Sequence, residues 1–277
     1  MKKRIITSIV AVAVLLPVLL FADYPILPVA LSLCTIIAVY EMLKCLGFSK
    51  SVAVGVPFYL LAAFLPAAIR WLDHGLLTSV VLGAIILLPI YLFTVAVFSH
   101  GKYTVQSLGI VYFSLTYILA GFNAIIYVHD WEPGGEYIYL IAFLGAWITD
   151  IFAYFCGMLF GRGGKHKLIP DVSPKKTVEG SIGGIVFCIL SMILFGVIVE
   201  KIEPALNANL FIFAVAGLAV SIVAQIGDLS MSVIKRAYGI KDYGKLFPGH
   251  GGMLDRFDSV IAVASVLLVL CSFFNFF

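Results

Sequence analysis

The chain alternates between long apolar runs and short polar connections, and this alternation predicts its secondary structure. Each run is about 20 residues long, the length that crosses the hydrocarbon core of a bilayer as a helix. A segment in lipid must be helical, because its backbone amides and carbonyls find no water there. The pattern predicts an all-α polytopic integral membrane protein of about nine transmembrane helices, at residues 5–22, 25–44, 52–70, 76–99, 105–128, 137–160, 181–200, 208–235 and 258–276.

Composition supports this interpretation. Hydrophobic residues make up 62% of the 277 residues and charged residues only 12%, about half the charged share of a typical soluble protein. A water-soluble domain of this size needs more polar cover on its surface. The basic start and first apolar run resemble a signal peptide, but Phe21-Ala22-Asp23-Tyr24 fits a cleavage site poorly. We therefore expect an uncleaved first helix.

Basic residues in the loops predict the orientation. If Met1 lies in the cytoplasm and the chain changes sides at each span, 16 of the 18 Lys and Arg residues fall inside, and only Arg70 and Lys201 fall outside. Cytoplasmic loops carry such an excess of Lys and Arg. We therefore expect a multi-pass protein of the cell (inner or plasma) membrane with a cytoplasmic N-terminus. The net charge of +3 reflects this topology, and it does not indicate a nucleic-acid partner.

The two halves of the chain differ in their chemistry. Within one continuous membrane domain, we expect transmembrane scaffold helices at 1–140 and a catalytic region at 141–277. In the first half, Glu41 and Lys44 are three residues apart near the cytoplasmic end of a span, where a local ion pair is expected. The second half has two long, basic, glycine-rich loops, predicted to be cytoplasmic. Carboxylates flank them near the membrane boundary, namely Asp150, Asp228, Asp255 and Asp258.

Asp228 lies in an apolar run together with other polar residues. On a helix, Gln225, Asp228, Ser232 and Lys235 share one face. A carboxylate inside a span costs about 2.5–3.5 kcal/mol unless it meets a partner or a cavity. Taken alone, Asp228 fits a structural ion pair or a proton relay as well as a catalytic site.

The segment at 241–259 indicates phosphate chemistry. Its glycines let backbone amides approach an anion closely, as in phosphate-binding nests. Asp255 and Asp258 are spaced for one face of a helix, and carboxylates beside cations suggest Mg²⁺ with a polyphosphate. The positive-inside rule explains the lysines but neither the paired aspartates nor the run Gly249-His250-Gly251-Gly252.

The earlier loop carries a similar set. Lys175 and Lys176, with the hydroxyls of Ser173 and Thr177, suit phosphate oxygens. Thr177 with Gly180 is also expected to cap the seventh span. Zinc is not expected, because His100, His166 and His250 lack a cysteine or second histidine at ligand spacing. His250 either donates a hydrogen bond to phosphate or shapes the glycine turn.

The C-terminal pattern resembles the phosphatidate cytidylyltransferase (CDP-diacylglycerol synthase) family. The resemblance rests on Ser-Pro-Lys-Lys-Thr-x-Glu-Gly at 173–180, Gln-x-Gly-Asp-Leu at 225–229 and the long motif from Ser232 to Ser259. One departure is Met231, where the family commonly has an acidic residue. The motifs cover about residues 150–259, whereas the first half matches only in being hydrophobic and multi-spanning.

The resemblance implies that CTP and phosphatidate react to CDP-diacylglycerol and pyrophosphate. It implies that Asp228 and Asp255 hold Mg²⁺, supported by Asp150 and Asp258, with a second cation as an open alternative. It also implies membrane lipid as a partner and a chain that can form a homodimer. The implied catalytic residues are Asp228, Asp255, Lys235, Arg256 and Asp258. The implied residues for CTP or lipid phosphate are Ser173, Lys175, Lys176, Thr177, Ser232, Lys241, His250, Gly251 and Gly252.

Other classes remain as alternatives. A CTP-dependent lipid kinase would share the membrane and the nucleotide but would release CDP. A proton-coupled transporter would place ionisable groups near the bilayer midplane and paired broken helices in both halves. The polar residues of this chain instead gather in one half and on one predicted side. The motif of CDP-alcohol phosphotransferases is absent from the sequence.

Overall fold

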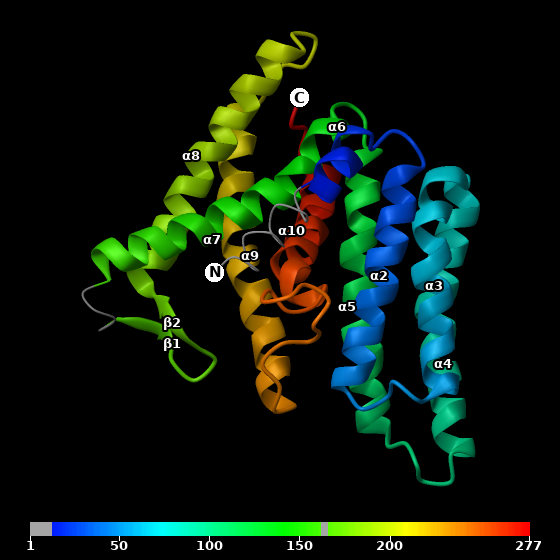
Figure 1. Ribbon diagram of the computed structural model, residues 1–277. Coiled ribbons are helices and arrows are strands. Elements are labelled where there is room, and N and C mark those ends of the chain that lie inside the picture. Colours follow the sequence, from blue (N-terminus) through cyan, green and yellow to red (C-terminus); the bar gives the residue numbers. More distant parts are fainter. Residues whose placement is uncertain (1–12, 162–165) are drawn as a thin grey trace. The chain divides into compact units, whose positions relative to one another are not determined.

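The fold is a set of long helices with one small hairpin. The computed structural model describes residues 13–161 and 166–277, and positions 1–12 and 162–165 lie outside the described residues. Within the described part, eight helical segments are long and apolar enough to cross a membrane. They are α2 (Ile26–Cys45), α3 (Val52–Trp71), α4 (His74–Phe98), α5 (Val105–His129), α6 (Gly135–Ile138) continuing into α7 (Leu140–Phe160), α8 (Val178–Ile202), α9 (Leu210–Ala237) and α10 (Leu254–Phe273). The chain is an all-α polytopic membrane protein in this coarse sense (Figure 1).

The helices agree closely with the predicted spans. The first predicted span, at 5–22, lies partly outside the described residues and is helical at 13–20. The last helix begins at Leu254 rather than 258, so Asp255 and Asp258 both lie in its first turns. The total of nine spans stays a prediction, because the start of the chain lies outside the description.

The described structure divides into two compact units, each made of two stretches of chain. Unit 1 contains residues 1–126 and 242–255, and unit 2 contains residues 127–241 and 256–277. The glycine-rich segment at 242–255 therefore groups with the N-terminal helices. The expected division into scaffold (1–140) and catalytic region (141–277) stays a prediction.

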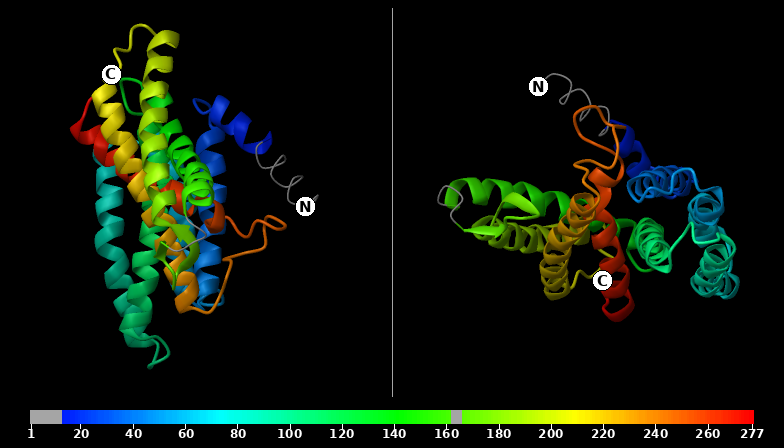
Figure 2. Two further views of the ribbon diagram at one scale, coloured as in Figure 1. Left: turned by 90° about the vertical axis from the view of Figure 1, so that its left-hand side faces the viewer. Right: turned by 90° about the horizontal axis from the view of Figure 1, so that it is seen from below.

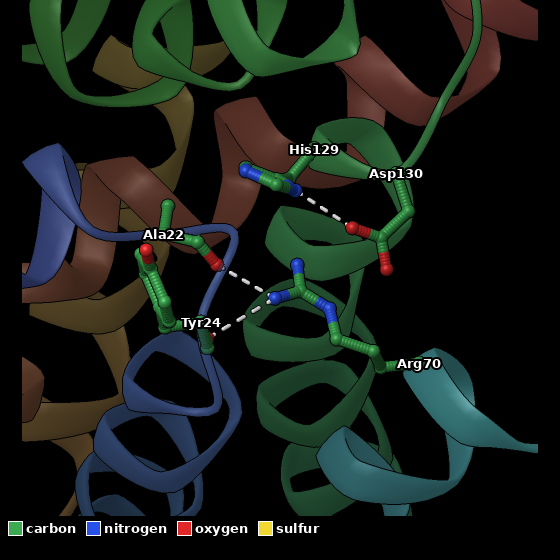
Figure 3. Close-up of polar contacts among 5 residues, drawn as sticks. All are labelled: Ala22, Tyr24, Arg70, His129 and Asp130. Atoms are coloured by element: carbon green, nitrogen blue, oxygen red, sulfur yellow. Dashed lines mark hydrogen bonds and ion pairs between the residues drawn. The ribbon is translucent and has the colours of Figure 1, made fainter.

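In unit 1, helices α2 to α5 run side by side, and the right-hand view of Figure 2 shows them nearly along their axes. Their connections are short, and polar contacts fix them. The Tyr103 hydroxyl donates to the Ser51 hydroxyl at 2.9 Å. The Arg70 guanidinium, at the end of α3, donates to the carbonyls of Ala22 (2.6 Å) and Tyr24 (3.3 Å), as Figure 3 shows.

In unit 2, helices α7, α8 and α9 pack through small residues. A Cβ at Gly184 would lie 3.0 Å from the Thr149 carbonyl, and one at Gly217 would lie 2.7 Å from the Ile189 Cα. Helices in lipid associate by such close backbone approach rather than by a hydrophobic driving force. At the end of α5, the His129 ring pairs with the Asp130 carboxylate at 2.6 Å (Figure 3).

Within the described residues, the paired strands form a hairpin before α8. Strands β1 (Lys167–Ile169) and β2 (Ser173–Thr177) pair antiparallel, with Lys167 opposite Thr177. The predicted cap of α8 is confirmed, because the Thr177 hydroxyl accepts from the Gly180 amide at 3.1 Å. The all-α expectation missed the strands because Ser-Pro-Lys-Lys-Thr lacks the alternation of apolar and polar residues that marks a strand.

Candidate active site

Three carboxylates from three helices interact within unit 2. Asp150 lies on α7, Asp228 on α9 and Asp258 on α10. The charge of Asp228 acts on both Asp150 and Asp258, and the latter two also act on each other. Asp258 is buried, Asp228 half-buried and Asp150 exposed. Like charges at this range repel, and nearby cations reduce that repulsion.

Glycine lets two of these helices approach. A Cβ at Gly227, next to Asp228, would lie 2.6 Å from the Ala262 Cβ and 2.9 Å from the Asp258 carbonyl. Any larger residue would push α9 away from α10. A glycine at position 227 therefore allows close packing of α9 and α10, and this packing brings Asp228 and Asp258 into electrostatic range.

Three basic side chains balance the carboxylates. The Lys176 ammonium of β2 forms an ion pair with Asp228. Lys235, only 8% exposed on α9, acts on Asp258, and Arg256 acts on Asp150. We call the six residues Asp150, Lys176, Asp228, Lys235, Arg256 and Asp258 the charge cluster. A hairpin and three helices thus supply an equal number of acidic and basic groups to one region.

The hairpin that carries Lys176 is fixed at both ends. Thr177 caps α8, and the His166 ring contacts the Glu179 carboxylate at 2.5 Å. Successive side chains of a strand point to opposite faces, and Lys176 is half-buried beside Asp228 whereas Lys175 is exposed. The two adjacent lysines therefore stand in different surroundings.

The remaining predicted residues of unit 2 lie on or next to the elements that carry the cluster. Ser232 is half-buried one turn beyond Asp228 on α9, and Lys241 is exposed after the end of that helix. Ser173 pairs with Ile169 across the hairpin. Gln225 is buried on the same face of α9, where its amide donates to the Ser221 carbonyl at 3.3 Å. On this face of α9, Gln225 is buried, and Asp228, three residues later, belongs to the charge cluster.

In unit 1, Asp255 folds the glycine-rich segment onto itself. Its Oδ2 accepts from the amides of Tyr243 (2.8 Å) and Gly252 (2.9 Å). A tight turn lies between them, in which the His250 amide donates to the Phe247 carbonyl at 2.8 Å. Gly251 has a φ of +86°, a conformation that favours glycine, and a Cβ there would lie 2.7 Å from Asp255 Oδ2. The predicted residues His250, Gly251, Gly252 and Asp255 thus form one structured loop.

Glu41 on α2 binds the backbone at the end of this loop, a contact that the sequence interpretation missed. The expectation was an ion pair with Lys44, but the carboxylate is 4% exposed and accepts from the amides of Met253 (3.0 Å) and Leu254 (2.9 Å). Its charge is nevertheless within electrostatic range of Lys44. The available signal was its position, because an ionisable residue inside a membrane span indicates a functional site.

The carboxylates of the site suit a hard, oxygen-binding cation, although the described residues contain no group of three or more His, Cys, Asp or Glu side chains placed to hold a metal ion. Mg²⁺ does not require such a group, since one or two carboxylates plus substrate phosphates usually hold it. The interacting Asp150, Asp228 and Asp258 offer that donor set. The residues present therefore fit a Mg²⁺ ion that arrives with a phosphorylated substrate.

Comparison with known proteins relates the whole chain to one family. The sequence model of the cytidylyltransferase family matches residues 2–274. A phosphatidate cytidylyltransferase of Staphylococcus haemolyticus is 34% identical over 274 residues, which are 98% of each chain. Proteins of the same name from Staphylococcus saprophyticus and Staphylococcus aureus are each 34% identical, over 273 and 271 residues, again 98% of each chain. The similarity includes the first half, which the sequence motifs did not reach.

Proposed function

This chain belongs to the cytidylyltransferase family, and from that membership we propose that it transfers the cytidylyl group of CTP to phosphatidate. The products are CDP-diacylglycerol and pyrophosphate. The observation that carries the proposal is the full-length similarity to proteins named phosphatidate cytidylyltransferase. The charge cluster supports it, because polyphosphate substrates require dense positive charge next to metal-binding carboxylates.

The chemistry needs little from the protein beyond placement. An oxygen of the lipid phosphate is already anionic, so no side chain has to remove a proton from it. That oxygen forms a bond to the α-phosphorus of CTP while the bond to the β-phosphate oxygen breaks, and pyrophosphate leaves with the electron pair. Catalysis therefore consists of orienting the two phosphates in line and neutralising their charge.

In the proposal, the basic residues have two roles, charge neutralisation and attraction of the substrates. Lys176, Lys235 and Arg256 neutralise the triphosphate and the lipid phosphate from within the charge cluster. Lys175 and Lys241, which are exposed, attract the anionic substrates to the site. The hydroxyls of Ser173, Ser232 and Thr177, and the turn formed by His250, Gly251 and Gly252, bind phosphate oxygens. The Thr177 hydroxyl already accepts a hydrogen bond from Gly180 and can still donate its proton to phosphate.

Asp228 and Asp255 would hold Mg²⁺, supported by Asp150 and Asp258, and a second cation would complete a two-metal site. When bound, Mg²⁺ polarises the phosphates and offsets the charge that develops on pyrophosphate. Asp228 pairs with Lys176 and Asp258 lies within electrostatic range of Lys235, so these carboxylates have basic partners before the nucleotide binds. We further propose that the site faces the cytoplasm, where CTP is available, and that two chains form a homodimer.

The test is release of pyrophosphate by purified protein in mixed micelles. We expect pyrophosphate only when CTP, phosphatidate and Mg²⁺ are all present, and we expect no release when diacylglycerol replaces phosphatidate. Diacylglycerol lacks the nucleophilic phosphate but would be a substrate for a lipid kinase. Release of CDP in place of pyrophosphate would contradict the proposal and favour the kinase.

A further inference from the structure

A carboxylate buried in helix α2 of unit 1 holds the backbone of the C-terminal motif, although the two are more than 200 residues apart. Glu41 lies on α2 and is 4% exposed. Its two oxygens accept from consecutive amides, Oε1 from Met253 at 3.0 Å and Oε2 from Leu254 at 2.9 Å. These amides belong to the start of α10, where helix N–H groups have no partner inside the helix. Glu41 thus caps α10 from another helix.

The loop backbone is shaped to the Glu41 carboxylate. A Cβ added to Gly244 or to Gly252 would collide with that carboxylate, so both glycines leave the space that it occupies. The two glycines approach it from either end of the segment at 242–255. This close fit is specific to Glu41, because a shorter side chain would leave the amides of Met253 and Leu254 without an acceptor.

The same stretch of backbone also binds Asp255. The Gly252 amide donates to Asp255 Oδ2 at 2.9 Å, while the next two amides donate to Glu41. Three consecutive amides are therefore divided between two carboxylates, and the two carboxylates lie within electrostatic range of each other. Because both carboxylates are bound to one short segment, loss of the Glu41 contacts would free the segment that positions Asp255.

We propose that Glu41 is a positioning residue for cytidylyl transfer, which fixes the loop at 242–255 and the first turn of α10 so that Asp255 is held ready for the metal–nucleotide complex. This inference rests on the proposed role of Asp255 in holding Mg²⁺. Glu41 itself touches neither substrate nor metal. It acts through the backbone amides of Met253 and Leu254.

The test compares Glu41→Gln with Lys44→Gln in purified, detergent-solubilised protein. Glutamine has nearly the same shape, but an NH2 group replaces one of the two acceptor oxygens, so only one of the Met253 and Leu254 amides keeps an acceptor. We expect Glu41→Gln to lower kcat by about 10–100-fold and to raise the half-saturating Mg²⁺ concentration by a similar factor, as removal of a metal site's supporting partner does. Lys44 is exposed, so we expect Lys44→Gln to keep the wild-type kcat and Mg²⁺ dependence. A loss in this variant would point to an ion pair between Glu41 and Lys44 instead.

A second measurement is independent of activity. Lys241 and Lys245 are exposed and flank the start of the loop, so trypsin cleavage after them reports how well the loop is held. We expect faster cleavage in Glu41→Gln than in the wild type. The Asp242→Asn variant serves as a matched control, because it removes an exposed carboxylate of the same loop, and its cleavage after Lys245 should be unchanged.

The outcomes separate the inference from the proposed function. If Glu41→Gln lowers kcat without changing the Mg²⁺ dependence, or if Lys44→Gln reproduces its effect, the positioning role is wrong. If Asp255→Asn remains fully active, the proposed role of Asp255 fails first, whatever Glu41 does. Inactive Asp255→Asn together with a normal Glu41→Gln variant would overturn the inference alone.

Discussion

Asp228 is the central residue of the charge cluster, because it interacts with both other carboxylates and pairs with Lys176. In Asp228→Asn the amide keeps the shape but removes the charge that would bind a cation. We expect kcat to fall about 100–1000-fold, the size seen when one charge-stabilising group is removed from an active site. The steady-state assay of pyrophosphate release measures this.

The matched control is Asp171→Asn, which neutralises an exposed carboxylate between β1 and β2. It should retain wild-type turnover. Near-normal activity of Asp228→Asn at saturating Mg²⁺ would remove this residue from the proposed metal site.

Lys175 and Lys176 provide a comparison within one strand. Only Lys176 pairs with Asp228, so Lys176→Gln removes both a substrate contact and the partner of a half-buried carboxylate. We expect Lys176→Gln to lower kcat/KM by at least about tenfold more than Lys175→Gln, which corresponds to about 1.4 kcal/mol of transition-state stabilisation. Equal losses would show that the two lysines act only through net charge.

At this scale, the sequence predicted the residues whose chemistry is visible in a motif. The Thr177 cap, which follows from a local propensity, is confirmed, whereas the catalytic and substrate roles of Asp228 and Lys176 stay predictions. Glu41 was assigned to its neighbour Lys44, since its actual partners are backbone amides of Met253 and Leu254. A hydrogen bond to a distant backbone leaves no pattern in the side chains.

The helices of unit 2 depend on glycines at their contacts. Gly217 on α9 faces the backbone of α8, where a Cβ would lie 2.7 Å from the Ile189 Cα and 3.2 Å from the Cys188 carbonyl. Backbone cannot rotate away, so Gly217→Ala must separate the helices at a cost of about 1–3 kcal/mol. We expect a lower Tm in detergent.

Gly83→Ala is the control for this substitution. Gly83 lies within α4 and has nothing within 4 Å of an added Cβ. Alanine there should leave the Tm unchanged or raise it slightly, since alanine favours the helix. A Gly217→Ala protein as stable as Gly83→Ala would contradict the close approach of α8 and α9.

Element positions were largely predictable because long apolar runs in lipid have only one regular structure available. The hairpin was not, since its strands are three and five residues long and polar. Its antiparallel pairing depends on the turn at 170–172 and on the contacts of Thr177 and His166 with the start of α8. These are contacts between elements, which periodicity does not report.

At the scale of the whole molecule, the proposed orientation can be measured directly. Lys201 and Lys245 are both exposed, but the charge distribution places Lys201 outside and Lys245 in the cytoplasm. In a variant without native cysteines, Lys201→Cys should react with a membrane-impermeant maleimide in intact cells, and Lys245→Cys only after lysis. The opposite labelling would reverse the topology.

The division into two units also belongs to this scale. The expected change of character near residue 140 stays a prediction, and the segment at 242–255 groups with the N-terminal helices in the described structure. Glu41 gives the physical reason, because its contacts with Met253 and Leu254 hold that segment against α2. The first half therefore contacts the C-terminal motif through Glu41, in agreement with a family similarity that covers 98% of the chain.

The most direct test of the account follows the fate of each phosphate of CTP. Purified protein is incubated with phosphatidate and Mg²⁺, and with CTP labelled at either the α- or the γ-phosphate. Cytidylyl transfer predicts that α-label enters lipid and that γ-label is found only in pyrophosphate, with both signals lost in Asp228→Asn. Entry of γ-label into lipid would contradict the account and identify a kinase.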